Sequence, residues 1–391
     1  MNYRCVHRWS FSNWGGPLDP REEPLEPPSG REVTLRVTDC GICHSDLHIQ
    51  AGGFDMGGGK LSSLERAGTR LPVTMGHEIG GEVVEIGPEV TGVSVGDRVI
   101  AYPWLGCGEC AVCARGDEQL CTKVARNLGI QLPGGYADLV RVPHERYLVP
   151  IGKLDPAHAA TFACAGITAW GAIRKLSPAT SEDWIAVVGC GGVGMTAVAL
   201  LSATSPAKIV AIDPDPAKRE AALANGASAA FDPTAPDALK TIARACAQNI
   251  AGALDFVGAE SSASLAANLV RRSGEVVIVG LFGGEAFLAL LVCDVRRDDF
   301  RLGAVSRPGS DVGHHRRTRQ AALFIADQQR EQTRRAHRRQ HGESPLVRPR
   351  LFDDHAKVAD RPAQADVAHE AVFSLERHDR PDRACAGKAP D

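Results

Sequence analysis

Four cysteines in one short stretch have the spacing of a metal site. Cys107, Cys110, Cys113 and Cys121 form the pattern C-x2-C-x2-C-x7-C in a turn-rich run. Thiolates two residues apart can hold one tetrahedral zinc ion from a tight loop, and four of them leave no position for water. The pattern therefore predicts a structural zinc rather than a redox pair, because a dithiol switch needs only two cysteines. Four unlinked buried cysteines are the alternative.

A second candidate metal site draws on residues that are far apart in the sequence. Cys43 lies in the run CGICHSDLH, and His77 is followed directly by Glu78. A single cysteine or histidine is more often structural than ligating, and two protein ligands are too few for zinc. Cys164, in the apolar run TFACAG, is the third candidate. Three ligands leave one position for water or a substrate oxygen, as in a catalytic zinc site.

A glycine-rich run predicts a dinucleotide site. It matches G-x-G-x-x-G and consists, apart from Cys190, of Gly189, Gly191, Gly192, Val193 and Gly194. The run follows the apolar segment WIAVV, and Asp213 lies 19 residues beyond Gly194. The glycines let the backbone and a helix N-terminus approach a pyrophosphate, and the acid accepts the adenine-ribose hydroxyls. Because a carboxylate there repels a 2′-phosphate, NAD is favoured over NADP. Lys218 either contacts the same ribose or is a solvated helix charge.

Two kinds of domain must position these residues. The first 165 residues combine Gly, Pro and Val with short alternating segments, which predicts a β-rich, barrel-like domain with long loops. From Trp184 onward, apolar and helix-like segments alternate, as they do in βαβ units with a parallel sheet. The expected strands are 184–188, 208–212, 254–257, 275–279 and 300–305, and the expected helices are 195–203, 216–225, 237–248 and 262–271.

The C-terminal residues have a different composition. Residues 307–391 hold 15 Arg and 2 Lys against 13 Asp and Glu, a charge of +4, although the whole chain of 391 residues has a charge of −3. Only 13 of these 85 residues are Leu, Ile, Val or Phe, below the roughly 20% at which a folded core becomes doubtful. We expect a disordered or misfolded tail. An Arg-rich RNA-binding arm is the alternative, but acids dilute its charge and it has no Tyr or Trp for base stacking.

Export and membrane signals are not expected from this sequence. The N-terminal residues lack an apolar signal-peptide core, and glycines interrupt the most apolar long stretch, residues 184–205. The charge of −3 gives no electrostatic case for a nucleic acid or an anionic membrane. We therefore expect a cytoplasmic protein with neither partner, whose cysteines serve as metal ligands rather than in disulfides.

Together, the motifs resemble those of the zinc-dependent medium-chain alcohol dehydrogenases. CGICHSDLH, GHEIGGEVVEIG, GDRV, the four-cysteine run, PGGYADLVRVP, CAGITAW and GCGGVG occur in the order of that family, and LPVTMGHE is most similar to prokaryotic and archaeal members. The resemblance implies an α/β fold. Its parts are a GroES-like β-barrel catalytic domain at 1–165, with the structural zinc lobe at 107–121, and a Rossmann domain with a doubly wound parallel sheet at 166–305.

The resemblance also assigns the metal ligands. It implies that Cys43, His77 and Cys164 bind the catalytic zinc, with Glu78 beside the metal and able to exchange onto it. Asp46 is then expected to orient His77 through a hydrogen bond.

Four further residues receive roles in the same way. Ser45 is expected to accept the alcohol proton and to pass it through the nicotinamide ribose to His48. His44 is expected to contact the cofactor pyrophosphate. Trp104 is expected either to line the substrate pocket or to serve as a packing residue.

The implied activity is the reversible oxidation of an alcohol to an aldehyde or ketone by hydride transfer to NAD. An alkoxide is a better hydride donor than an alcohol, so a Lewis-acidic zinc has to lower the pKa of the hydroxyl, and the nicotinamide accepts the hydride. Two zinc ions per chain and a homodimer or homotetramer are expected. The alternatives are an NADPH-dependent aldehyde or ketone reductase, and a catalytically impaired zinc-binding product.

The resemblance ends near Val305. Family members continue with a returning helix and a closing strand, and neither is recognisable in residues 306–391. Their Arg-, His-, Asp- and Pro-rich composition is similar to a GC-rich coding region read in the wrong frame, so we hypothesise a frameshift near residues 306–312. Loss of the returning segment would remove many kcal/mol from a stability of only about 5–15 kcal/mol.

Overall fold

The computed structural model describes residues 4–55, 60–123, 126–281 and 372–374. The chain divides into two compact units. Of the described residues, the first unit holds those up to Trp170, apart from Asp55 and Lys60, together with residues 372–374, and the second holds those from Gly171 to Leu281. The expected boundary after residue 165 lies close to this point. Each unit is described below by itself. In the described part of the chain, no helix combines the length and the apolar character that a membrane crossing requires.

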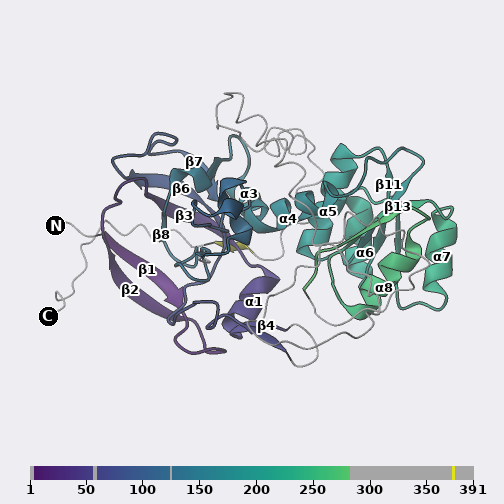
Figure 1. Ribbon diagram of the computed structural model, residues 1–391, viewed down its shortest axis with the longest axis horizontal. Coiled ribbons are helices and arrows are strands. Elements are labelled where there is room, and N and C mark those ends of the chain that lie inside the picture. Colours follow the sequence, from purple (N-terminus) through teal and green to yellow (C-terminus); the bar gives the residue numbers. More distant parts are fainter. Residues whose placement is uncertain (1–3, 56–59, 124–125, 282–371, 375–391) are drawn as a thin grey trace, which may run out of the picture. The chain divides into compact units, whose positions relative to one another are not determined.

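An antiparallel sheet of six strands forms the framework of the first unit (Figure 1). Its strands are β3 (Val33–Gly41), β6 (Glu78–Ile86), β7 (Arg98–Ala101), β8 (Leu139–Val142), β9 (Leu148–Pro150) and β15 (Val372–Ser374). β3 pairs with β6 along one edge and with β8 along the other. The apolar side chains of Leu35, Ile79 and Val99 are completely buried in the core of this unit. The predicted β-rich domain is confirmed.

The strand β15 comes from the C-terminal region. It pairs with the end of β3 so that Val372 lies opposite Gly41, on the edge that β8 occupies further along. The interpretation that residues 306–391 contain no strand is corrected at these three residues, since Val and Phe are good strand formers and a free edge offers hydrogen bonds. The expected disorder of the remaining tail and the expected strand at 300–305 lie outside the described residues.

Two β-ribbons and several short helices complete the first unit. The ribbons pair β1 (Arg4–Ser10) with β2 (Asp19–Leu25), and β4 (Gly53–Asp55) with β5 (Leu61–Ser63). The helical segments are α1 (His44–Gln50), α2 (Ala111–Ala114), η1 (Glu118–Leu120), η2 (Glu145–Tyr147), α3 (Pro156–Thr161), the π-helical turn η3 (Phe162–Gly166) and α4 (Ile167–Ile173), which runs across the boundary. α3 begins where the Asp155 carboxylate accepts the N–H of Ala157.

A parallel sheet of five strands, with helices between them, forms the second unit (Figure 1). The strands are β10 (Trp184–Val188), β11 (Lys208–Ile212), β12 (Ala229–Phe231), β13 (Ile250–Asp255) and β14 (Glu275–Ile278), and the helices are α5 (Gly192–Thr204), α6 (Pro216–Ala224), α7 (Ala238–Ala245) and α8 (Glu260–Leu269). The strand order is β12-β11-β10-β13-β14, which is the order of a doubly wound sheet. The order reverses between β10 and β13, and dinucleotides bind at the carboxyl ends of such strands.

Two elements of this sheet differ from the prediction. The strand expected at 254–257 runs from Ile250 to Asp255. It ends there because the N–H groups of Val257 and Gly258 turn back to the Asp255 carboxylate, at 2.9 and 3.1 Å. The short strand β12 was not predicted, since three residues carry no periodicity. The ends of the other expected strands and helices of this unit are displaced by at most three residues.

Candidate active site

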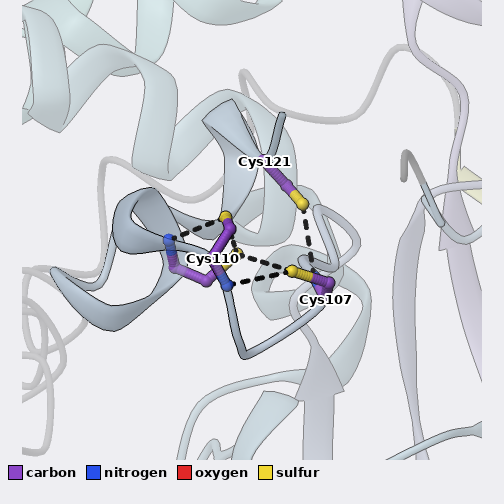
Figure 2. A group of neighbouring side chains, drawn as sticks. Cys107, Cys110 and Cys121 are labelled. Carbon is purple, nitrogen blue, oxygen red and sulfur yellow. Dashed lines mark hydrogen bonds between the residues drawn. The ribbon is translucent and has the colours of Figure 1, made fainter. Parts of the chain in front are cut away.

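Four sulfur atoms meet in the loop that contains α2 and η1 (Figure 2). The ligand atoms of Cys107, Cys110, Cys113 and Cys121 all lie within 4.8 Å of one another. The sulfurs of Cys107 and Cys113 are 3.8 Å apart, as expected of two thiolates on a tetrahedral zinc with bonds of about 2.3 Å. A hydrogen bond from the Cys113 N–H lowers the pKa of the Cys110 thiol to about 5. This donor set fits a closed zinc site.

Glu118 ties this zinc lobe to the rest of the first unit. Its carboxylate accepts hydrogen bonds from the Gly106 N–H at 3.2 Å, from Arg146 at 3.1 Å and from the Tyr147 hydroxyl. The Arg146 guanidinium also lies 4.7 Å from the centre of the Tyr147 ring. Because Gly106 directly precedes Cys107 and Glu118 lies between Cys113 and Cys121, a metal in the lobe would hold both in position for η2.

Replacing Cys110 by serine is expected to remove one zinc ion per chain and to lower the melting temperature by about 10 °C. A structural zinc contributes directly to folding free energy, and a loss of about 3 kcal/mol corresponds to such a shift. Calorimetry and metal analysis measure both effects. Cys246→Ala is the matched control, because Cys246 is a buried thiol that belongs to none of the metal-donor groups among the described residues. A serine variant with unchanged zinc content and melting temperature would contradict the assignment.

A second group of donors lies at the end of β3. The ligand atoms of Cys43, His77, Glu78 and Cys164 are within 4.8 Å of one another. Cys43 is the N-cap residue of α1, and His77 leads into β6, which Glu78 begins. Cys164 lies in the π-helical turn η3, a type of turn that recurs at functional sites. Three separate elements therefore bring these side chains together.

The His77 imidazole is the strongest indication that this group binds a metal. His77 is completely buried, and its Nε2 has no hydrogen-bond partner among the described residues. Its Nδ1 lies 3.2 Å from Oδ1 of Asp46, the arrangement in which a carboxylate orients a metal-binding histidine. A buried nitrogen without a partner is costly, and a zinc ion at Nε2 would satisfy it.

The acidic groups around His77 also favour a cation. The neighbouring Cys164 thiol and His77 imidazole lower the pKa of the Cys43 thiol to about 4, despite its burial. Burial, followed by the charge of Cys43, raises the pKa of Glu78 to about 8. A β-carbon at Gly41 would lie 2.0 Å from a Glu78 carboxylate oxygen, so only glycine leaves room for this carboxylate. A divalent ion would relieve the repulsion between Cys43 and Glu78, and the residues present fit zinc.

The glycine-rich run of the second unit forms the turn between β10 and α5. Gly189 has a φ of +84°, which favours glycine. Gly194 packs so closely that a β-carbon there would lie 1.8 Å from the Gly189 carbonyl oxygen. Gly191 is the N-cap residue of α5. Its lack of a side chain leaves the first helical N–H groups accessible to an anion.

Asp213 lies at the end of β11, next to this turn. Its Oδ2 accepts the N–H of Cys190 at 2.8 Å, and its Oδ1 accepts the N–H of Asp215 at 2.9 Å. The two bonds fix the carboxylate, and each oxygen retains a second lone pair for a ribose hydroxyl. Lys218 is exposed on α6, and its charge lowers the pKa of the nearby Cys190 thiol, which burial raises.

Comparison with known proteins identifies the family. The model of the alcohol dehydrogenase GroES-like domain matches residues 29–153, and that of the zinc-binding dehydrogenases matches residues 192–327. The NAD-dependent alcohol dehydrogenase of Sulfurisphaera tokodaii is 37% identical over 272 residues, which are 69% of this chain and 77% of that relative. The chain belongs to the zinc-dependent medium-chain alcohol dehydrogenase family. The family match continues to residue 327, past the expected end near Val305.

Other members of the family agree in sequence and fold. An alcohol dehydrogenase of Geobacillus stearothermophilus is 34% identical over 317 residues, 80% of this chain and 86% of that relative. The structure of the alcohol dehydrogenase from Aeropyrum pernix has a TM-score of 0.62 and 30% identity, and the match covers 73% of this chain and 81% of that one. The GroES-like and Rossmann fold inferred from the sequence is confirmed.

Four side chains have roles implied by the family. Three of them lie on α1, which Cys43 caps, and the fourth lies beside His77. Ser45 and His48 are half-buried on α1, three residues apart and therefore on one side of the helix. His44 is exposed, and its ring centre lies 5.1 Å from that of His48. The half-buried Trp104 ring lies 5.7 Å from the His77 ring. The structure thus brings Trp104 to the donor group.

Two residues of the site were not identified from the sequence. Gly41 makes room for Glu78, and Tyr136 donates a hydrogen bond from its hydroxyl to Asp46 at 3.2 Å. Tyr136 lies in the family motif PGGYADLVRVP, and a hydroxyl-bearing aromatic after two glycines was the only available signal.

A third group of donor atoms does not form a metal site. Cys5, His7 and Glu22 lie within 4.8 Å of one another on the ribbon β1–β2. Cys5 is disulfide-bonded, which corrects the expectation of cysteines without disulfides. The His7 ring is hydrogen-bonded to Glu22 at 2.7 Å and to Asp138 at 3.0 Å. The Cys5 sulfur and both imidazole nitrogens of His7 are therefore already engaged.

Proposed function

We propose that this protein oxidises a small alcohol to an aldehyde or ketone, reversibly, with NAD and a catalytic zinc ion. The main support is the group of Cys43, His77 and Cys164, whose ligand atoms converge on a buried imidazole nitrogen without a partner. Three protein ligands with one further position are typical of a catalytic zinc site, in contrast to four thiolates. Relatives from Sulfurisphaera tokodaii and Saccharolobus solfataricus carry the name NAD-dependent alcohol dehydrogenase.

Cys43, His77 and Cys164 would hold the catalytic zinc, with Glu78 beside it. When bound there, zinc supplies Lewis acidity, which lowers the pKa of an alcohol hydroxyl. Asp46 would keep the His77 ring oriented from its other nitrogen. The thiolates would balance the metal charge, and the buried Glu78 carboxylate would serve as an exchangeable ligand.

The side chains of α1 would move the proton. Ser45 would accept it from the alcohol and pass it, through the nicotinamide ribose, to His48. His48 is only partly buried, and its ring packs on Phe54 at 5.2 Å between ring centres, so it could release the proton to solvent. Trp104 would line the substrate pocket beside His77, and the exposed His44 would contact the pyrophosphate.

The glycine-rich run from Gly189 to Gly194 would cradle the NAD pyrophosphate. Asp213 would bind the adenine ribose. NAD, when bound, supplies the hydride acceptor. The chain's own part is to expose the N–H groups of α5 to the phosphates and to hold Asp213 with two backbone bonds. Lys218 would contribute a positive charge on the ribose side.

Replacing Asp213 by asparagine is expected to lower the ratio of kcat/KM with NAD to that with NADP by at least about tenfold. The amide keeps an acceptor for the Cys190 N–H but loses the charge that repels a 2′-phosphate and strengthens the ribose bonds. Steady-state kinetics with both cofactors measure the ratio. Asp215→Asn, at the neighbouring cap of α6, is the control. An unchanged ratio would contradict this role, and a wild-type preference for NADPH would support the reductase alternative.

Zinc analysis of the purified protein, combined with NAD-linked oxidation of a panel of small alcohols, tests the proposed function. We expect two zinc ions per chain and turnover of at least one alcohol. One zinc ion without turnover would instead support the catalytically impaired zinc-binding product. Light scattering on the same sample tests the expected homodimer or homotetramer. A cytoplasmic location remains our proposal: nine of the described cysteines are free thiols, as a reducing compartment favours, although Cys5 is disulfide-bonded.

The frameshift near residues 306–312 remains a proposal as well. Its support is the Arg-, His-, Asp- and Pro-rich composition of residues 306–391, whereas the family match, which extends to residue 327, runs past the proposed position. Translation of the other two reading frames of the same DNA tests it. A family-like ending in one of them is expected, and its absence from both would refute the proposal.

A further inference from the structure

Tyr136 is fixed in place by the backbone beside the segment that leads to His77. The N–H groups of residues 134–136 donate to the carbonyls of residues 74–76, at distances of 2.8–3.0 Å. The Tyr136 carbonyl in turn accepts the Trp9 N–H at 2.8 Å. Any movement of Tyr136 is therefore coupled to the residues directly before His77.

The Tyr136 side chain reaches the second donor group through a space that a glycine provides. Gly76 has a φ of +89°, and a β-carbon there would lie 2.6 Å from the Tyr136 ring and 2.7 Å from the Cys40 sulfur. Tyr136 is 7% exposed, and its hydroxyl donates to Oδ2 of Asp46 at 3.2 Å. Burial, together with the Asp46 charge, raises the pKa of Tyr136, so the hydroxyl keeps the proton that it donates.

Asp46 connects this hydroxyl to two of the proposed zinc ligands. Its Oδ2 also accepts the backbone N–H of Cys43 at 2.9 Å, while its Oδ1 lies 3.2 Å from Nδ1 of His77. Two donors on Oδ2 fix the plane of the carboxylate and thereby aim Oδ1 at the imidazole. With only the Cys43 N–H left, the carboxylate could rotate, and the His77 ring would lose its fixed orientation.

We propose that Tyr136 is a positioning residue for the catalytic zinc: its hydroxyl holds Asp46, and Asp46 holds His77 and the backbone at Cys43. The inference rests on the proposed function, because it takes Cys43, His77 and Cys164 as zinc ligands. The hydroxyl acts on the metal only through Asp46 and touches neither the metal nor the substrate.

The test compares the full-length zinc-loaded wild type with Tyr136→Phe, which keeps the ring and its packing. During competition with a chelator, we expect one of the two zinc ions to be bound about tenfold more weakly in the variant, as is usual when a partner behind a metal ligand is lost. The zinc of the four cysteines should be unchanged. After replacement of the catalytic zinc by Co²⁺, the visible absorption bands should shift in the variant.

Tyr102→Phe is the matched control. Tyr102 is a partly buried tyrosine of the first unit, but its hydroxyl donates to Gln119 at 3.4 Å rather than to Asp46. We expect its catalytic zinc and Co²⁺ spectrum to equal those of the wild type. A double variant, Asp46→Asn with Tyr136→Phe, should release zinc no faster than Asp46→Asn alone, because the hydroxyl acts through Asp46.

Three results would overturn the inference. The first is an unchanged zinc affinity and Co²⁺ spectrum in Tyr136→Phe. The second is additive effects of the two substitutions in the double variant. The third is loss of both zinc ions together, or failure of Tyr136→Phe to fold, because either would show a general structural role of the residue. A wild type with only one zinc ion per chain would refute the proposed function itself. The zinc content of the wild type therefore distinguishes the two failures.

Discussion

Replacement of Cys43 by alanine is expected to abolish alcohol oxidation and to remove one of the two zinc ions. Cys43 supplies the thiolate with the lowest pKa of the second donor group, about 4. Without it, His77 and Cys164 remain as ligands, beside a carboxylate whose pKa is raised to about 8. Loss of the Lewis acid removes several kcal/mol of transition-state stabilisation, and about 4 kcal/mol corresponds to a thousandfold lower kcat/KM.

Metal analysis and steady-state kinetics on the same preparation check this expectation. Cys40→Ala is the control, because Cys40 is a buried cysteine of β3, three residues earlier, whose sulfur lies outside the donor group. The control should keep two zinc ions and the activity of the wild type. A Cys43→Ala variant that turns over alcohol at the wild-type rate would refute the assignment of this ligand.

The sequence predicts a site well when its residues are close together in the chain. Cys107 and Cys121 are joined by one short loop, so their spacing alone predicts that the sulfurs can meet on one metal. The same holds for the turn from Gly189 to Gly194, whose length is set by the strand before it and the helix after it. In both cases local geometry determines the site.

The second donor group has a different physical origin. Cys43 and His77 meet because β3 and β6 pair in an antiparallel register that places Gly41 opposite Glu78. Cys164 joins them from the π-helical turn η3. No spacing in the sequence encodes that register, so the residues alone indicated Cys43, His77 and Cys164 only as candidates, and the family resemblance assigned them as ligands. The role of Tyr136 was missed for the same reason, since it depends on the pairing of residues 134–136 with 74–76.

Substitution of Gly194 by alanine is expected to weaken NADH binding by at least about 100-fold, or about 2.7 kcal/mol. The added β-carbon would lie 1.8 Å from the Gly189 carbonyl oxygen, a distance that no two unbonded heavy atoms adopt. The turn between β10 and α5 must therefore open, which moves the N–H groups that face the pyrophosphate and costs about 1–3 kcal/mol of folding stability. Fluorescence titration with NADH and calorimetry measure the two effects.

Two further glycine variants separate the effect on the cofactor from the effect on folding. A β-carbon at Gly171, on α4, meets no atom of the described residues within 4 Å, so Gly171→Ala should bind NADH as the wild type does. A β-carbon at Gly191 likewise meets no described protein atom within 4 Å, yet it would point into the space that the pyrophosphate requires. Gly191→Ala should therefore keep the wild-type melting temperature and still bind NADH more weakly. If Gly194→Ala binds NADH as tightly as the wild type, the turn does not hold the cofactor, and the proposed role of the second unit is wrong.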